Sequence, residues 1–162
     1  MGRGVLFALT AEDNELISEA DTDEEVMAIV EQIEERWERP WLEELDKAWD
    51  ALHRCLNDGT LTEDGGEYPL SFAILGSEPV YDGDDYIVCY VAASTVVDVA
   101  EALKPLDEQW LRERYRSLDF VDYQGFRSEE DLVYTVAYFA DLKSFYQRAA
   151  AAGRAVIFTV DE

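Results

Sequence analysis

Apolar residues along the chain form three strand-like runs separated by longer helical stripes. The runs at 4–9, 86–91 and 155–160 are short and continuous, and the last two are rich in β-branched and aromatic residues, which is typical of buried strands. Between them, apolar residues recur three and four positions apart, as on one face of an amphipathic helix. Strands this far apart in sequence need helical connections, so the pattern predicts helices packed on a small sheet.

Start and stop signals divide the helical segments. Thr10, Thr22, Asp107 and Ser128 are N-cap residue types that each precede a helical pattern, and Ser94 or Thr95 is expected to cap the helix that ends at Leu103. The predicted helices begin after Thr10 and cover about 23–38, 41–56, 69–75, 94–103, 107–118 and 128–152. A polar loop is expected over 60–68. We therefore predict one helix-rich α+β domain over residues 1–162, with a sheet of three to four strands packed against about six helices.

The charge balance changes which partners are plausible. The chain carries 37 acidic and 13 basic residues among 162, a formal net charge of −24. This field repels nucleic acid and anionic membranes and attracts basic proteins, so we expect no nucleic-acid or membrane partner. No apolar run approaches the roughly 20 residues that span a bilayer, and no signal-peptide pattern is present. The expected location is cytoplasmic.

Residues capable of covalent or metal chemistry are few. Cys55 and Cys89 are isolated and are expected to be buried as small hydrophobic side chains. Asp46, Asp50 and His53 fall on one side of the predicted 41–56 helix. Metal sites on helices usually include more than one histidine motif, so this spacing favours a solvated acidic helix face. We assign no catalytic residue, metal ligand or cofactor from the sequence.

One segment carries a family resemblance. Residues 45–53 read LDKAWDALH, and residues 69–76 read PLSFAILG. Both segments resemble the YfbM-like family of uncharacterised bacterial proteins, in which Leu-Asp-Lys-x-Trp-x-x-Leu-His occurs in the same place. The resemblance extends over most of the chain and implies an α+β fold. It supplies no reaction, cofactor or catalytic residue, and it directs attention to Lys47, Trp49 and His53.

These three residues have two interpretations. Trp49 lies on the apolar stripe of the predicted helix, and His53 is four residues later on the same side. They could therefore be core residues, with Lys47 holding a loop. Alternatively, Lys47 and His53 could bind a polar or anionic group beside Trp49, with Tyr86 or Tyr90 nearby. The candidate ligand-binding residues are Lys47, Trp49, His53, Tyr86 and Tyr90.

The sequence favours a non-enzymatic, acidic interaction protein that binds a basic protein partner, for example as an inhibitor or an immunity protein. The candidate docking carboxylates lie on the predicted 23–38 helix and are Glu24, Glu25, Glu31 and Glu35. The alternative is a small-molecule-binding protein, or an unrecognised enzyme, with a pocket around Lys47, Trp49 and His53. A structural accessory without a discrete site is a third possibility, and the sequence leaves the oligomeric state open.

Overall fold

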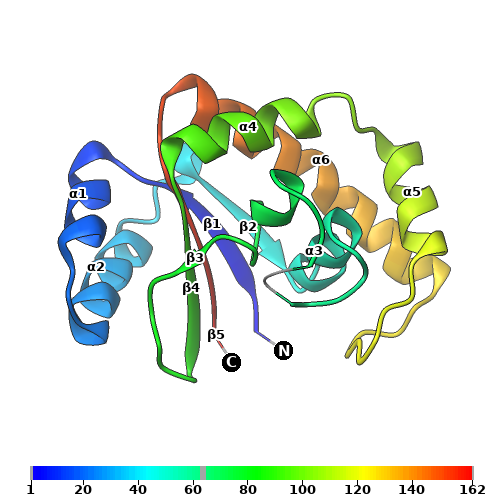
Figure 1. Ribbon diagram of the computed structural model, residues 1–162, viewed down its shortest axis with the longest axis horizontal. Coiled ribbons are helices and arrows are strands. Elements are labelled where there is room, and N and C mark those ends of the chain that lie inside the picture. The colour runs from blue at the N-terminus through cyan, green and yellow to red at the C-terminus, as the bar shows by residue number, and fades with distance from the viewer. Residues whose placement is uncertain (1, 63–64, 162) are drawn as a thin grey trace.

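A five-stranded antiparallel sheet forms the centre of the computed structural model, which describes residues 2–62 and 65–161 (Figure 1). The strand order is β2-β1-β5-β4-β3. The N-terminal and C-terminal strands are neighbours, with Leu6 opposite Phe158. The strands are β1 (Gly4–Ala8), β2 (Leu42–Asp46), β3 (Glu78–Pro79), β4 (Tyr86–Val91) and β5 (Val156–Asp161).

Six α-helices surround the sheet within the described residues. They are α1 (Ala11–Glu19), α2 (Asp23–Arg36), α3 (Trp49–Leu56), α4 (Ala93–Leu103), α5 (Glu108–Ser117) and α6 (Glu129–Ala151). Two 3₁₀ turns, Arg39–Trp41 and Leu70–Phe72, occur between them. Four predicted N-caps are confirmed: the side chains of Thr10, Thr22, Asp107 and Ser128 each accept a hydrogen bond from the backbone N–H three residues later. The expected cap at Ser94 or Thr95 is wrong, because α4 begins after Ala92 and has no side-chain cap.

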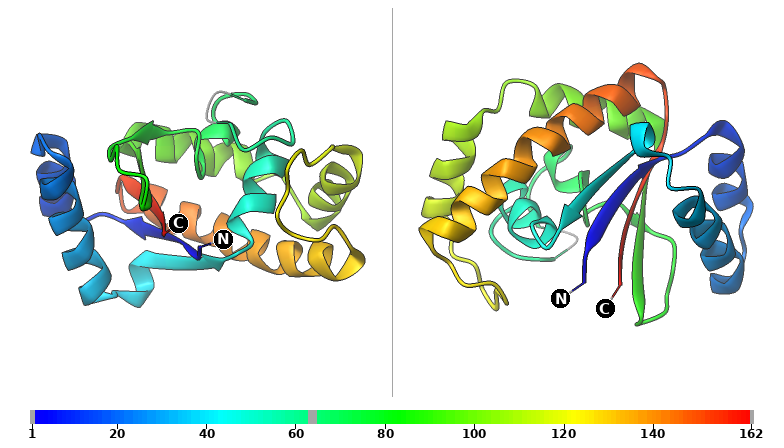
Figure 2. Two further views of the ribbon diagram at one scale, coloured as in Figure 1. Left: turned by 90° about the horizontal axis from the view of Figure 1, so that it is seen from below. Right: turned by 180° about the vertical axis from the view of Figure 1, so that it is seen from behind.

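The helices form two layers, one on each face of the sheet (Figure 2). The pair α1 and α2 covers one face, where Phe7 and Ile157 pack with Ile17 and Val30. The other four helices cover the opposite face over a larger core. Alternate residues of a strand point to opposite faces, so β1 and β5 supply both cores. The α+β class is confirmed.

The expected strand number is wrong, because the sheet has five strands and not three to four. The predicted 41–56 helix is in fact strand β2 followed by the shorter helix α3. Leu42 and Leu45 are three residues apart, a spacing that fits a helical stripe. In β2 the same spacing places them on opposite sides, where Leu42 packs with the α1–α2 core and Leu45 with the larger core. A strand that is buried on both faces can thus have the same spacing of apolar residues as an amphipathic helix.

Other segments agree with the sequence pattern to different degrees. The 69–75 helix is reduced to the turn Leu70–Phe72. The expected polar loop 60–68 includes residues 63–64, which lie outside the described residues. Cys55 and Cys89 are both buried, as expected. None of the helices in residues 2–62 and 65–161 is long and apolar enough to cross a membrane.

Candidate functional site

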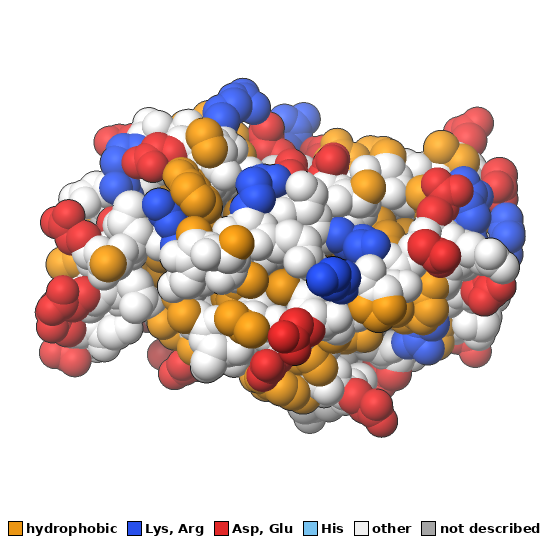
Figure 3. Space-filling view, turned by 90° about the horizontal axis from the view of Figure 1, so that it is seen from above, with side chains coloured by type: hydrophobic (Ala, Val, Ile, Leu, Met, Phe, Trp, Pro, Cys, Tyr) orange, Lys and Arg blue, Asp and Glu red, His pale blue; other side chains and the backbone are white. Residues whose placement is uncertain are grey.

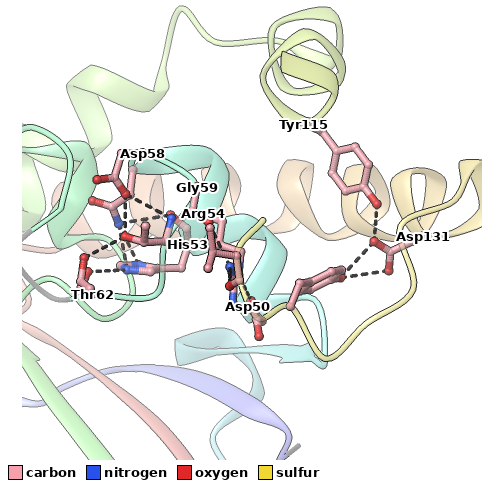
Figure 4. Close-up of polar contacts among 12 residues, drawn as sticks. Asp50, His53, Arg54, Asp58, Gly59, Thr62, Tyr115 and Asp131 are labelled. Carbon is pink, nitrogen blue, oxygen red and sulfur yellow. Dashed lines mark hydrogen bonds and ion pairs between the residues drawn. The ribbon is translucent and has the colours of Figure 1, made fainter. Parts of the chain in front are cut away.

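His53 is a buried side chain of α3 that connects two loops. It is 1% exposed. The Leu75 N–H donates to Nδ1 at 3.3 Å. Figure 4 shows the other contact, in which Nε2 lies 3.4 Å from the Thr62 carbonyl. The Asn57 side-chain nitrogen lies 2.8 Å from Nε2. Because Nδ1 accepts from the Leu75 N–H, the ring is neutral, and burial lowers the pKa of His53 to about 4. His53 therefore holds the segments after α3 in place, and its ring does not line the cleft that contains Lys47.

Trp49, at the start of α3, is also occupied by structural contacts. The ring is 5% exposed and lies 5.7 Å from the Phe158 ring between centroids. Its Nε1–H donates to the Gly2 carbonyl at 2.9 Å. Trp49 thus fixes the N-terminal segment against α3, and it too lies outside the lining of the Lys47 cleft.

Tyr86 and Tyr90 of β4 belong to the other face of the sheet. The Tyr86 hydroxyl donates to Glu34 at 2.7 Å, and the Tyr90 hydroxyl donates to Asn14 at 2.6 Å. Both acceptors lie on the α1–α2 pair. The structure therefore does not bring the five sequence-predicted residues together, and ligand binding by any of them stays a prediction.

Lys47 lies in an open cleft of about 370 Å³ between the β2–α3 junction and α6. The other residues that line it are Tyr123, Gln124, Gly125, Asp131 and Tyr134. The Tyr123 hydroxyl donates to Asp131 at 3.0 Å, and the Tyr134 hydroxyl donates to Asp46 at 2.6 Å. The Lys47 backbone N–H in turn donates to the Tyr134 hydroxyl at 3.2 Å. Two tyrosines and two carboxylates thus form a hydrogen-bonded wall beside the lysine.

A buried ion pair lies next to this cleft, and the sequence interpretation missed it. Asp50 and Arg54 are 2% and 1% exposed, and Nε of Arg54 lies 2.5 Å from Oδ1 of Asp50. Arg54 also donates to the carbonyls of Gly59 and Val121, and it lies 5.3 Å from the Tyr123 ring centroid. Asp50 is therefore no part of a solvated helix face. Its i, i+4 spacing to Arg54 was the available signal, but such pairs are normally exposed.

Asp131 joins this region to α5. It accepts a hydrogen bond from Tyr115 at 2.5 Å as well as from Tyr123 (Figure 4). Burial, together with the neighbouring Asp131 carboxylate, raises the pKa of both tyrosines. Both phenols are therefore neutral donors near pH 7, and Asp131 is held in a fixed orientation at the start of α6.

A second hollow of about 460 Å³ lies between α1 and α2. It is lined by Glu12, Asp13, Leu16, Gln32, Glu35 and Arg36. Residues 11–36 contain eleven acids and one base, Arg36, which pairs with Asp13 at 2.5 Å. The four expected docking carboxylates of α2 are exposed, and none forms an ion pair within the described residues. Figure 3 shows acidic side chains along the edge of the molecule where α1 and α2 lie.

Because of this excess negative charge, we expect the stability of the protein to depend on salt concentration. Mutual repulsion of the acidic side chains opposes the compact state, and added salt screens it. Raising NaCl from low concentration to the physiological range is expected to stabilise the protein by about 1 kcal/mol, which corresponds to a rise in Tm of about 2–4 °C for a domain of this size. Thermal unfolding at both ionic strengths checks this, and an unchanged or lower Tm contradicts it.

The fold and the two hollows define an α+β domain with a helical layer on each face of an antiparallel sheet, an acidic groove on one side and a tyrosine-lined cleft on the other. Residues 1–159 match the family described as a domain of unknown function, DUF1877, so the chain belongs to that family.

The fold is similar to that in the crystal structure of a protein of unknown function, YfbM from Escherichia coli. The TM-score is 0.69 at 21% sequence identity, with 99% of each chain covered. The predicted resemblance to YfbM-like proteins is thereby confirmed. No curated protein matches the chain.

Proposed function

We propose that the protein is a non-enzymatic binding protein that docks a basic protein partner in the acidic groove between α1 and α2. The observation that carries the proposal is the composition of this helix pair, eleven acids against one base. That single base is already paired with Asp13. Most carboxylates of the pair therefore lack a cation of this chain, and a basic partner would supply one.

The groove also has a shape and an apolar contact that suit a protein partner. Glu12 and Glu35 line it from different helices, and Leu16, which is 39% exposed, lies between charged neighbours. A lysine or arginine side chain could place its charged end near the two glutamates and its methylene groups on Leu16. Binding of this kind depends on long-range attraction, so association is fast at low salt and slow at high salt.

A pull-down from the protein's own cell lysate tests the proposal with matched charge variants. The groove variant is Glu12→Gln/Glu35→Gln, and the control is Glu101→Gln/Glu113→Gln, which removes two exposed charges elsewhere. We expect one basic protein to be retained by wild type and control at low salt and released at high salt. With the purified partner, the association rate for the groove variant should fall about threefold or more at low salt, and this difference should vanish at high salt.

Two results would contradict the proposal. The first is a partner retained equally by the groove and control variants, because the groove would then not be the docking surface. The second is binding that persists at high salt without change, because electrostatic attraction would then not drive it.

The alternative of one pocket shared by Lys47, Trp49 and His53 has less support. Trp49 and His53 are buried and hydrogen-bonded to backbone groups, and neither lines the cleft that contains Lys47. Ligand binding by Lys47 would have to use the residues that do line the cleft.

A further inference from the structure

The ammonium group of Lys47 lies in a cleft lined by other polar side chains. Lys47 is exposed at the cleft and makes no side-chain hydrogen bond or ion pair with any residue in 2–62 or 65–161. Its three N–H donors are available to an anionic group. In a protein with 37 carboxyl-bearing side chains, a cation that pairs with none of them in its own cleft is available for a ligand.

The same cleft also offers a negative charge that Lys47 does not contact. Asp131 and Lys47 both line the cleft without forming an ion pair. The Asp131 carboxylate accepts from two tyrosine hydroxyls, and a carboxylate has about four acceptor positions, so it can accept from one further donor. The Tyr123 hydroxyl donates to Asp131, so its oxygen keeps a lone pair that can accept from an ammonium group beside that carboxylate.

These charges exclude simple ions and favour a ligand that carries both signs. An anion without a positive group would be repelled by Asp131 and by the net charge of −24. A cation without a negative group would be repelled by Lys47. We propose that the Lys47 cleft binds a zwitterionic small molecule of the free amino acid class, with its carboxylate on Lys47 and its ammonium group beside Asp131 and the tyrosines. This site does not depend on the acidic groove, which belongs to the α1–α2 layer on the opposite face of the sheet.

The rest of the cleft favours an aromatic or apolar side group. A volume of about 370 Å³ admits a molecule the size of phenylalanine. The rings of Tyr123 and Tyr134 form part of its wall, and Phe126, next to the lining residue Gly125, is 84% exposed. Aromatic side chains at the edge of a polar cleft could cover an apolar side group of the ligand.

The test uses the full chain, thermal unfolding and calorimetric titration. The probes are the twenty standard amino acids, together with two analogues of phenylalanine, 3-phenylpropanoate without the ammonium group and 2-phenylethylamine without the carboxylate. We expect at least one apolar or aromatic amino acid to raise Tm by roughly 3–6 °C at about ten times its Kd. Phenylalanine is expected to bind at least about tenfold more tightly than either analogue, because each analogue leaves one charge of the cleft unpaired.

Variants of the two lysines locate the site. Lys47→Ala should weaken binding about tenfold or more, and Lys47→Arg should retain it within a few-fold. Lys104→Ala is the matched control, because Lys104 is also exposed but lies at the end of α4 outside the cleft, and it should leave binding unchanged. No binding by any amino acid, equal binding of an analogue that lacks one charge, or full binding by Lys47→Ala would each overturn the proposal.

Discussion

Replacing Asp50 by alanine is expected to lower the free energy of unfolding by about 3–5 kcal/mol, which is a large part of the stability of an ordinary domain. Asp50 and Arg54 are almost completely buried, and their charged atoms are 2.5 Å apart. Without the carboxylate, the Arg54 guanidinium group keeps two carbonyl partners and two aromatic neighbours but has no counter-charge. Burying an uncompensated charge costs several kcal/mol.

The double variant Asp50→Ala/Arg54→Met separates the cost of a lone charge from that of lost packing. It removes both charges and keeps an apolar chain at position 54, so we expect it to be more stable than Asp50→Ala alone. Arg112→Ala is the surface control, because Arg112 forms ion pairs with exposed Glu108 and Glu129, and it should cost less than about 1 kcal/mol. Denaturant unfolding measures all three. A double variant no more stable than Asp50→Ala would refute the explanation.

The same pair explains how the α5–α6 connection is held against α3. Arg54 donates to the Val121 carbonyl at 2.7 Å and lies beside the Phe120 and Tyr123 rings. Tyr123 in turn donates to Asp131 and lines the Lys47 cleft. A buried charge on α3 thus positions one wall of the cleft, although Arg54 itself is not in contact with the hollow.

The elements that the sequence predicted well are those with local signals. A capping side chain makes its hydrogen bond three residues away, so the starts of the helices after Thr10, Thr22, Asp107 and Ser128 could be predicted from the sequence. Strand β2 could not be predicted from the sequence, because its two buried leucines belong to different cores and their spacing also fits a helix. Only the pairing of β2 with β1 distinguishes the two possibilities, and it joins residues as far apart in sequence as Gly4 and Asp46.

The candidate site was predicted only at Lys47. Asp131, Tyr123 and Tyr134 come from segments about 80 residues later, and no local spacing connects them with the lysine. Tyrosine hydroxyls also take a role that sequence interpretation usually gives to lysine and arginine: Tyr115, Tyr123 and Tyr134 donate to carboxylates. In a chain with few cations, phenols can stabilise partly buried carboxylates without adding positive charge.

Lowering the pH from 7 to 4 is expected to remove about 3 kcal/mol of stability through His53 alone. Burial is the main cause that lowers the pKa of this group to about 4 in the folded protein, against about 6.5 in the unfolded chain. Between these values the unfolded chain binds a proton that the folded protein does not, so stability falls as pH falls. Each unit of pKa shift corresponds to about 1.4 kcal/mol, and the loss is complete below pH 4.

The hydrogen bonds of the His53 ring explain why the folded protein disfavours its protonated form. Nδ1 accepts from the Leu75 N–H, and a proton on Nδ1 would point at that donor. The nearby Arg54 charge also disfavours the imidazolium form. Protonation therefore requires loss of this contact, and the segments around Thr62 and Leu75 that His53 connects to α3 should separate first.

The variant His53→Asn isolates the effect, because an asparagine carbonyl can accept from the Leu75 N–H but does not titrate. Acid also protonates carboxylates and reduces their repulsion, but wild type and variant share that change. The measured quantity is the difference in unfolding free energy between the two proteins at each pH, which we expect to shift by about 3 kcal/mol against the wild type between pH 7 and pH 4. His53 is the single histidine of the chain, so its NMR titration is free of overlap. A midpoint near pH 6.5, or parallel stability profiles, would show that the ring is not held neutral by the fold.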